Sequence, residues 1–251
     1  MKPKVCVLVT DGTNCDKETA YAFRKAGGNS ELVHINQLRN RQRNFRDYQI
    51  LVISGGFSHG DVVASGKILA VELIFLQDEL EAFVEKGKLI MGICNGFQVL
   101  TQTGLLPLNT MNVRYATLMQ NESGKFECRW VKLLAEKNSP CIFTQGYDEE
   151  FTLQVANGEG NFFIEDKWPE VKENGGCVAL RYSSDEYPEN PSGSLYAIAG
   201  ICDPSGRIFG LMPHPERFVE GTQYVNWRRE KIAKPNGLLM FENAVRFAKD
   251  L

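Results

Sequence analysis

Short apolar runs alternate with helical patterns over the first 104 residues, and this alternation constrains the fold more than any other feature. The apolar runs have the length of buried strands and cover Val5–Thr10, Glu31–Ile35, Ile50–Ser54 and Leu89–Ile93. The helical patterns cover Asp16–Ala26, Val62–Lys86 and Asn95–Thr103. Such an alternation favours βαβ units and a mostly parallel sheet flanked by helices.

The second half of the chain is richer in strands. Four more runs are expected as strands: Phe151–Ala156, Cys177–Tyr182, Leu195–Cys202 and Ile208–Met212. The turn residues Asp203–Gly206 predict a hairpin between the last two, and a final helix is expected over Leu238–Ala248. No repeat or linker divides the sequence. We therefore expect residues 1–251 to form a single α/β domain, with an open, mostly parallel sheet and an antiparallel extension.

Composition excludes several classes of protein. Hydrophobic residues make up 43% and charged residues 24%, as in globular proteins. The net charge of −3 shows no basic surplus, which argues against a nucleic-acid partner. No apolar run reaches the roughly 20 residues of a membrane helix, and no signal-peptide core follows the N-terminus. We expect a cytoplasmic protein without a membrane partner.

Seven cysteines and three histidines limit the available chemistry. No two cysteines are spaced as C-x-x-C, so neither a zinc ribbon nor a dithiol centre is indicated, and no metal is expected. Most of the thiols should be inert core residues. Any base that serves a nucleophile must come from His34, His59 or His214.

The strand Leu89–Ile93 runs into Gly92-Ile93-Cys94-Asn95-Gly96, and a helix follows. This G-x-C-x-G pattern is the thiol form of a nucleophile elbow, in which a tight strand-to-helix turn exposes the nucleophile. Residues without Cβ atoms allow the backbone to pack closely there. The helix N-terminus favours negative charge on the sulfur. Cys94 is therefore the candidate nucleophile, although a buried structural cysteine is the alternative.

His214 is the candidate base because it follows an apolar strand and lies between two prolines that stop the strand. Glu216, two residues on, can orient the imidazole, which completes a Cys-His-Glu triad. His59 is a weaker rival on a loop after another strand. His34 lies inside a predicted strand, where a structural role is favoured.

The loop Gly55–Asp61 contains a second feature of catalytic interest. Its glycines allow backbone N–H groups to approach a reacting carbonyl, as an oxyanion hole requires. A plain Gly-Gly turn is the alternative. No Walker or G-x-G-x-x-G pattern occurs, so nucleotide hydrolysis by this chain has no support.

Four arginines fall within eight residues, at Arg39, Arg41, Arg43 and Arg46. A solvated loop is the favoured interpretation, and a docking patch for an acidic partner is the alternative.

Together these motifs resemble the triad (class I) glutamine amidotransferases. The resemblance rests on Gly92-Ile93-Cys94-Asn95-Gly96-Phe97-Gln98, on Gly55–Asp61 and on Pro213-His214-Pro215-Glu216-Arg217, and it covers essentially the whole chain. It is strongest to the branch of glutaminase subunits that serves phosphoribosylformylglycinamidine synthase of purine biosynthesis. One departure is Asn157, which precedes Gly158-Glu159-Gly160 where histidine is usual in that branch.

The resemblance implies specific roles. Cys94 would attack the side-chain amide of glutamine, and His214, held by Glu216, would transfer protons. Gly56 and Phe57 would form the oxyanion hole, and Gln98 would help to hold glutamine. This chain would carry no cofactor. Ammonia would pass to a large synthetase subunit that uses Mg²⁺ and ATP on formylglycinamide ribonucleotide, and a small subunit would bridge the two chains.

Two other functions remain open at this stage. A stand-alone thiol hydrolase of γ-glutamyl or peptide bonds could use the same elbow without a partner. A binding module that had lost catalysis would be favoured by a missing triad residue, but Cys94, His214 and Glu216 are all present.

Overall fold

A nine-stranded sheet organises the computed structural model, which describes residues 1–61, 64–164, 176–230, 232 and 234–251. Five parallel strands run in the order β2 (Asn29–His34), β1 (Lys4–Val9), β3 (Ile50–Ile53), β4 (Leu89–Ile93) and β11 (Ile208–Leu211). Four antiparallel strands continue it: β10 (Ile198–Cys202), β9 (Val178–Tyr182), β6 (Glu127–Ala135) and β7 (Phe151–Asn157). Strands β5 (Ala116–Met119) and β8 (Asn161–Ile164) form a separate pair. The predicted fold class and the β10–β11 hairpin are confirmed.

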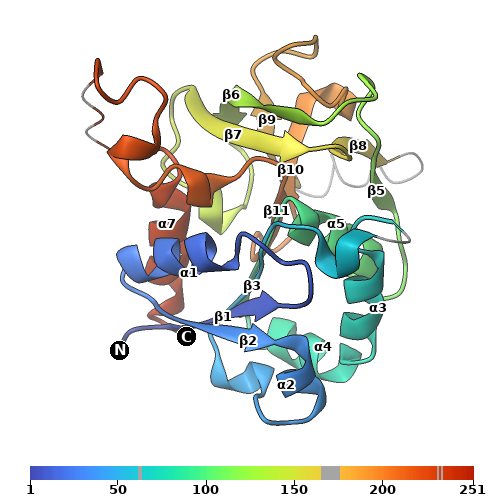
Figure 1. The fold of residues 1–251 in the computed structure, drawn as a ribbon. Coiled ribbons are helices and arrows are strands. Elements are labelled where there is room, and N and C mark those ends of the chain that lie inside the picture. The colour runs from blue at the N-terminus through green and yellow to red at the C-terminus, as the bar shows by residue number, and fades with distance from the viewer. Residues whose placement is uncertain (62–63, 165–175, 231, 233) are drawn as a thin grey trace.

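Helices cover both faces of the parallel strands (Figure 1). On one side lie α1 (Asp16–Lys25) and α7 (Leu238–Ala248), where the rings of Phe23 and Phe241 meet edge to face at 4.9 Å. On the other lie α3 (Lys67–Ile74), α4 (Gln77–Glu85) and α5 (Asn95–Thr103). None of the described helices is long and apolar enough to cross a bilayer.

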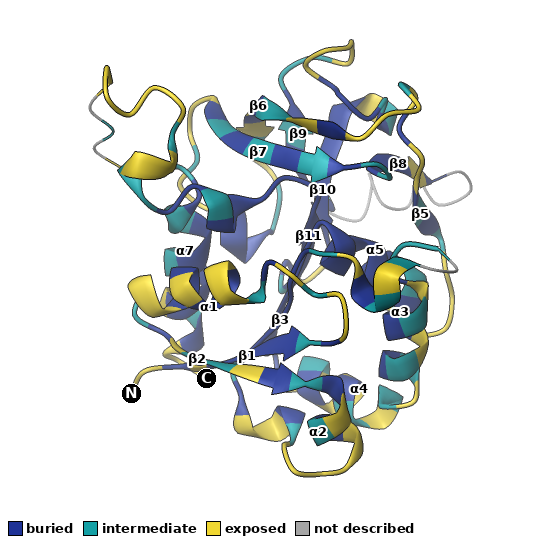
Figure 2. Ribbon diagram, viewed as in Figure 1, coloured by how far each residue is buried: buried dark blue, intermediate teal, exposed yellow. Residues whose placement is uncertain are grey.

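Every residue of β3 and β4 is buried. Figure 2 shows the dark blue of buried residues around β1 and β3. Strands covered by helices on both faces lose their contact with water on both sides, which explains why β3 and β4 read as unbroken apolar runs. The carboxyl end of β4 therefore lies in the middle of the sheet, with β3 and β11 on its two sides.

The prediction of one long helix over Val62–Lys86 is wrong in its extent. Residues 62–63 lie outside the described part of the chain, and two helices, α3 and α4, occupy most of the remainder. The chain leaves helical geometry at Leu76, next to the 78% exposed Phe75. The two helices pack on different neighbours: α3 contacts α5, and α4 contacts the turn around Phe45 through Phe83. Tertiary packing therefore imposes a break that the apolar pattern does not contain.

The strand expected over Leu195–Cys202 begins only at Ile198. Tyr196 and Ala197 have φ values of +51° and +54°, which no strand accommodates. The Asn190 side chain fixes this turn by bonding to both the N–H and the carbonyl of Ser194.

Two further differences concern the end of β2 and the strand β6. The strand expected over Glu31–Ile35 ends at His34, which caps the unpredicted short helix α2 (Ile35–Arg39). Strand β6 escaped prediction because charged residues such as Lys132 occupy its exposed positions.

Candidate active site

Cys94 lies at the turn between β4 and α5 with φ +52° and ψ −106°, a conformation that L-residues rarely adopt. Two glycines make the turn possible. A Cβ on Gly96 would lie 1.9 Å from the Ile53 carbonyl oxygen of β3, and a Cβ on Gly92 would lie 2.6 Å from the Gly96 carbonyl. The expected G-x-C-x-G elbow is therefore present, and its glycines are required by backbone-to-backbone contact.

The first turn of α5 begins directly at the nucleophile. The N–H groups of Phe97 and Gln98 both donate to the Cys94 carbonyl. The first N–H groups of a helix have no carbonyl partner within it, and in elbow enzymes the N–H after the nucleophile serves the oxyanion hole. Asn95 thus becomes a candidate oxyanion donor that sequence reasoning missed. Its position directly after the elbow cysteine was the available signal.

His214 and Glu216 form a buried pair after β11. Nδ1 of His214 lies 2.5 Å from Oε1 of Glu216, and each residue is only 1% exposed. A backbone bond to Gln154 of β7 fixes His214, because its N–H donates to the Gln154 carbonyl at 2.7 Å. Nε2 of His214 has no partner among the described residues and is left for a proton transfer.

The electrostatic environment of His214 favours the imidazolium. Burial by itself lowers the pKa of His214, but the charges of Glu216 and of the Cys94 sulfur outweigh it. The neighbouring side chains of Cys15 and Cys94 act in the same direction, so the pKa of His214 stands well above its ordinary value.

Cys15 belongs to this site as well, although sequence analysis assigned it no role there. Arg217 donates from Nη2 to the Cys15 sulfur at 3.2 Å, and the Cys15 thiol donates to Oδ1 of Asn14 at 3.2 Å. Ligand atoms of Cys15, His214 and Glu216 lie within 4.8 Å of one another. Cys15 joins the site only through the fold, since 199 residues separate it from His214.

The Asn95 side chain connects the elbow to its surroundings. Its Oδ1 accepts from the Ser58 hydroxyl at 2.6 Å, and its Nδ2 donates to Asp61 (3.1 Å) and to Oε1 of Gln98 (3.0 Å). Gln98 in turn donates to the Glu159 carbonyl at 2.7 Å. Gln98 therefore helps to order this network, and its expected contact with glutamine stays a prediction.

Backbone contacts with residues 12–14 hold the loop that carries the expected oxyanion donors. The N–H of Phe57 donates to the Gly12 carbonyl at 3.0 Å. Gly56 has φ +143°, and a Cβ there would lie 2.7 Å from the Asn14 nitrogen. The Phe57 donor is thus occupied in this structure, and the role of Gly56 and Phe57 in an oxyanion hole stays a prediction.

A cavity of about 260 Å³ brings the predicted site residues together. Its lining includes five of the six predicted site residues: Gly56, Phe57, Cys94, Gln98 and His214. Glu216 lies behind His214, as a residue that orients it should. The lining also includes residues that the sequence did not assign to the site: Asn14, Asp61, Ser65, Phe126, Ala156, Asn157, Gly158, Glu159 and Arg217.

The other histidines have different partners. Nε2 of His59 lies 3.0 Å from the Thr10 hydroxyl and 2.9 Å from Glu72, and His59 is not among the residues that line the cavity. His34 accepts the Asn36 N–H and caps α2. His214 is therefore the histidine that faces the Cys94 cavity.

The arginine cluster forms surface ion pairs. Arg39 contacts Glu72 at 3.3 Å and Arg43 contacts Glu31 at 2.7 Å. These contacts agree with a solvated face.

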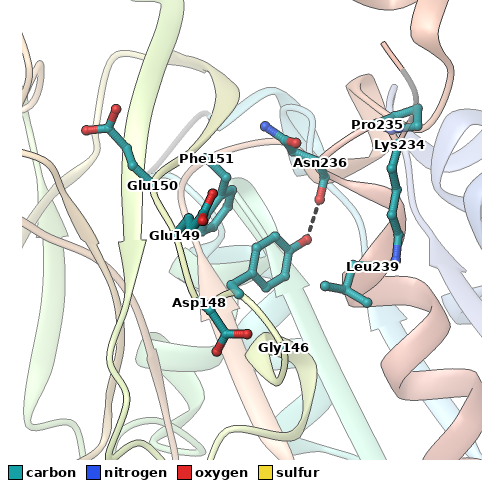
Figure 3. Close-up of a pocket in the computed structure, with 10 residues that line it drawn as sticks. Gly146, Asp148, Glu149, Glu150, Phe151, Lys234, Pro235, Asn236 and Leu239 are labelled. Atoms are coloured by element: carbon teal, nitrogen blue, oxygen red, sulfur yellow. Dashed lines mark hydrogen bonds between the residues drawn. The ribbon is translucent and has the colours of Figure 1, made fainter.

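A separate cavity of about 360 Å³ lies between the start of β7 and the start of α7 (Figure 3). Its lining includes three acidic residues, Asp148, Glu149 and Glu150, and also Tyr147, whose hydroxyl donates to the Asn236 carbonyl. Its lining residues are distinct from those of the Cys94 cavity.

Comparison with known proteins assigns the family. The CobB/CobQ-like glutamine amidotransferase domain matches residues 2–248, and the chain belongs to this family of glutamine amidotransferases. Its relatives include phosphoribosylformylglycinamidine synthase subunit PurQ of Dehalococcoides mccartyi, which is 45% identical over 100% of this chain and 99% of that protein. PurQ of Methanococcus maripaludis is 43% identical over 98% and 97% of the two chains. A chain in the solved structure of PurLQS from Thermotoga maritima is 34% identical, with a TM-score of 0.77 and coverage of 98% and 99%.

Proposed function

We propose that this chain is the glutaminase subunit of phosphoribosylformylglycinamidine synthase. It hydrolyses glutamine to glutamate and supplies the ammonia with which a synthetase converts formylglycinamide ribonucleotide to formylglycinamidine ribonucleotide. The observation that carries the proposal is the elbow cysteine, Cys94, facing a buried His214–Glu216 pair in a chain that matches PurQ subunits along its whole length.

The chemistry follows from these groups. The Cys94 thiolate attacks the side-chain carbonyl carbon of glutamine, and the oxygen takes up negative charge. The His214 imidazolium gives its proton to the amide nitrogen, the carbon–nitrogen bond breaks, and ammonia leaves a glutamyl thioester on Cys94. Neutral His214 then takes a proton from water, which attacks the thioester and releases glutamate. Glu216 holds the imidazole ring in place throughout.

The partners follow from the same proposal. A large synthetase subunit receives the ammonia and binds Mg²⁺ and ATP, and a small subunit bridges the two chains. This chain itself uses no cofactor. The free thiols described along the chain suit a reducing compartment, and we place the activity in the cytoplasm.

The occupied Phe57 N–H supports control by the partner. While Phe57 bonds to Gly12, one expected oxyanion donor is unavailable, so the lone chain should turn over slowly. A synthetase that contacts the Gly55–Asp61 loop could release this donor. Coupling between sites typically amounts to about 1–3 kcal/mol, or a gain of roughly 5–150-fold.

The test compares glutamine hydrolysis by the chain alone and after addition of purified synthetase and small subunit, with ADP and the ribonucleotide present. We expect the complex to be faster by a factor in that range. Full turnover by the lone chain, unchanged by the partners, would favour a stand-alone hydrolase instead. Absence of turnover in both samples would favour a silent binding module.

A further inference from the structure

Three potential metal ligands meet beside the Cys94 cavity. One ligand atom from each of Cys15, His214 and Glu216 lies within 4.8 Å of the other two, and all three residues are buried. Among the described residues, no other group of three histidine, cysteine or carboxylate side chains has this spacing. A thiol, an imidazole and a carboxylate are the three kinds of ligand that Zn²⁺ uses in proteins. The cluster therefore has the composition of a zinc site.

Glu216 contributes an oxygen that the proposed hydrolysis does not use. Its Oε1 lies 2.5 Å from Nδ1 of His214 and orients the ring. Its Oε2 is buried and has no hydrogen-bond partner among the described residues. Buried polar atoms are almost always paired, so this unpaired oxygen calls for a partner. A carboxylate oxygen can serve as a metal ligand.

The fold holds the Cys15 sulfur against the same pair. Cys15 directly precedes α1, and its N–H donates to the Gly55 carbonyl at 3.2 Å. A Cβ on Gly55 would lie 2.8 Å from Cε1 of His214 and 3.5 Å from the Cys15 sulfur. Because Gly55 has no side chain, the sulfur and the imidazole share this space.

The Cys15 sulfur is oriented by two neighbours. Its thiol donates to Oδ1 of Asn14, and Nη2 of Arg217 donates to the sulfur, both at 3.2 Å. The guanidinium group places a positive charge near the sulfur, which opposes the approach of a cation. A divalent ion would displace two protons, however, one from the thiol and one from the His214 imidazolium. The net charge of the site is then the same before and after binding, so Arg217 does not exclude the ion.

From this arrangement we infer that Cys15, His214 and Glu216 bind a thiophilic divalent cation of the Zn²⁺ type, and that the bound ion stops glutamine hydrolysis. Zinc holds such ligands at roughly 2.0–2.3 Å and can keep water as a fourth ligand. The sulfur ligand disfavours Mg²⁺, which prefers oxygen ligands. The ion acts as an inhibitor and not as a cofactor.

Inhibition follows from the loss of a proton at His214. An imidazole that binds the ion has given up the proton that it would otherwise transfer to the leaving amide nitrogen of glutamine. This inhibitory effect rests on the proposed glutaminase function, whereas binding of the ion does not. The two parts of the inference are therefore tested separately.

Calorimetric titration of the full chain with zinc sulfate tests the binding. We expect one tight site in the wild-type chain. Cys15→Ser should weaken binding by more than the roughly 10–100-fold that loss of an outer-shell partner causes. Cys94→Ala should bind zinc as the wild type does. The matched control is Cys128→Ser, which removes the exposed thiol and should also leave the binding unchanged.

Cobalt provides a readout that a merely structural role of Cys15 would not produce. A bond between Co²⁺ and a thiolate gives a charge-transfer absorption in the near ultraviolet. We expect this absorption in the wild type and in Cys94→Ala, and we expect none in Cys15→Ser or Cys15→Ala. An absorption that requires Cys94 but not Cys15 would overturn the inference. Thermal unfolding without metal identifies which of the two Cys15 variants is folded and can be used.

The activity of the reconstituted complex tests the consequence. At a fixed Mg²⁺ concentration, Zn²⁺ should abolish glutamine hydrolysis at concentrations near its measured Kd, while ammonium-dependent synthesis continues. A parallel loss of both activities would place the inhibition on the synthetase and overturn this part of the inference. A complex that fails to hydrolyse glutamine before zinc is added would instead refute the proposed function, and zinc binding to the chain would still stand.

Discussion

Replacement of Glu216 by glutamine should destabilise the protein in a pH-dependent way. The pKa of His214 is raised in the folded state, largely by the charge of Glu216, against the opposing effect of burial. The ion pair therefore stabilises the fold fully below the unfolded histidine pKa of about 6.5. This stabilisation is lost as the pH rises through the folded pKa of His214.

The magnitude follows from burial. Both residues are 1% exposed and their atoms lie 2.5 Å apart. Removal of one partner from a buried pair costs about 3–5 kcal/mol, because the remaining charge has no compensation. Near pH 6 we expect Glu216→Gln to lose stability in this range, or about 6–20 °C in Tm. Above the folded pKa of His214, the substitution affects only a hydrogen bond to the neutral imidazole, and the loss of stability should be about 0.5–1.5 kcal/mol.

Urea unfolding of both proteins from about pH 6 to pH 10 measures this difference. Glu220→Gln is the control, because it removes the exposed pair with Lys25 and should cost less than about 1 kcal/mol throughout. A loss at Glu216 that stays constant with pH would refute the electrostatic account. So would a loss near pH 6 no larger than that of Glu220→Gln.

Two further predictions concern the elbow and the base. Gly96→Ala should destabilise by about 3 kcal/mol or more and abolish glutaminase activity, because its Cβ would lie 1.9 Å from the Ile53 carbonyl. Gly221→Ala, whose Cβ would meet only ordinary contacts from 3.4 Å outward, should unfold like wild type in the same thermal scan. In steady-state assays of the complex, His214→Asn should lose about 10²–10⁴-fold in kcat, and His59→Gln far less, because His59 bonds to Thr10 and Glu72 outside the cavity. Comparable losses at the two histidines would contradict the assignment of the base.

Local sequence patterns were sufficient to predict the parts of the site that a single turn defines. Cys94 was found because an elbow needs small residues two positions before and after the nucleophile, and backbone contacts explain both glycines. His214 and Glu216 are two residues apart, so one short motif contained the whole pair. The parallel sheet was predictable for a similar reason, since buried central strands such as Leu89–Ile93 are apolar at every position.

Contacts made through the fold were not predictable in this way. Cys15 and Arg217 meet only because β1 and β11 lie in one sheet, and no local pattern links them. The break between α3 and α4 follows from packing against different neighbours and leaves the apolar periodicity intact. The hydrogen bond from Phe57 to Gly12 joins two loops, so the sequence could identify a glycine-rich loop but not its occupied donor.

Ammonium rescue of the Cys94→Ala complex tests the central claim most directly. The variant chain is assembled with synthetase and small subunit, and product formation from formylglycinamide ribonucleotide and ATP is measured with glutamine or with an ammonium salt as nitrogen source. The account predicts that ammonium supports synthesis at the wild-type rate while glutamine supports none. Synthesis from glutamine by the Cys94→Ala complex would contradict the account, because ammonia would then arise without the elbow cysteine.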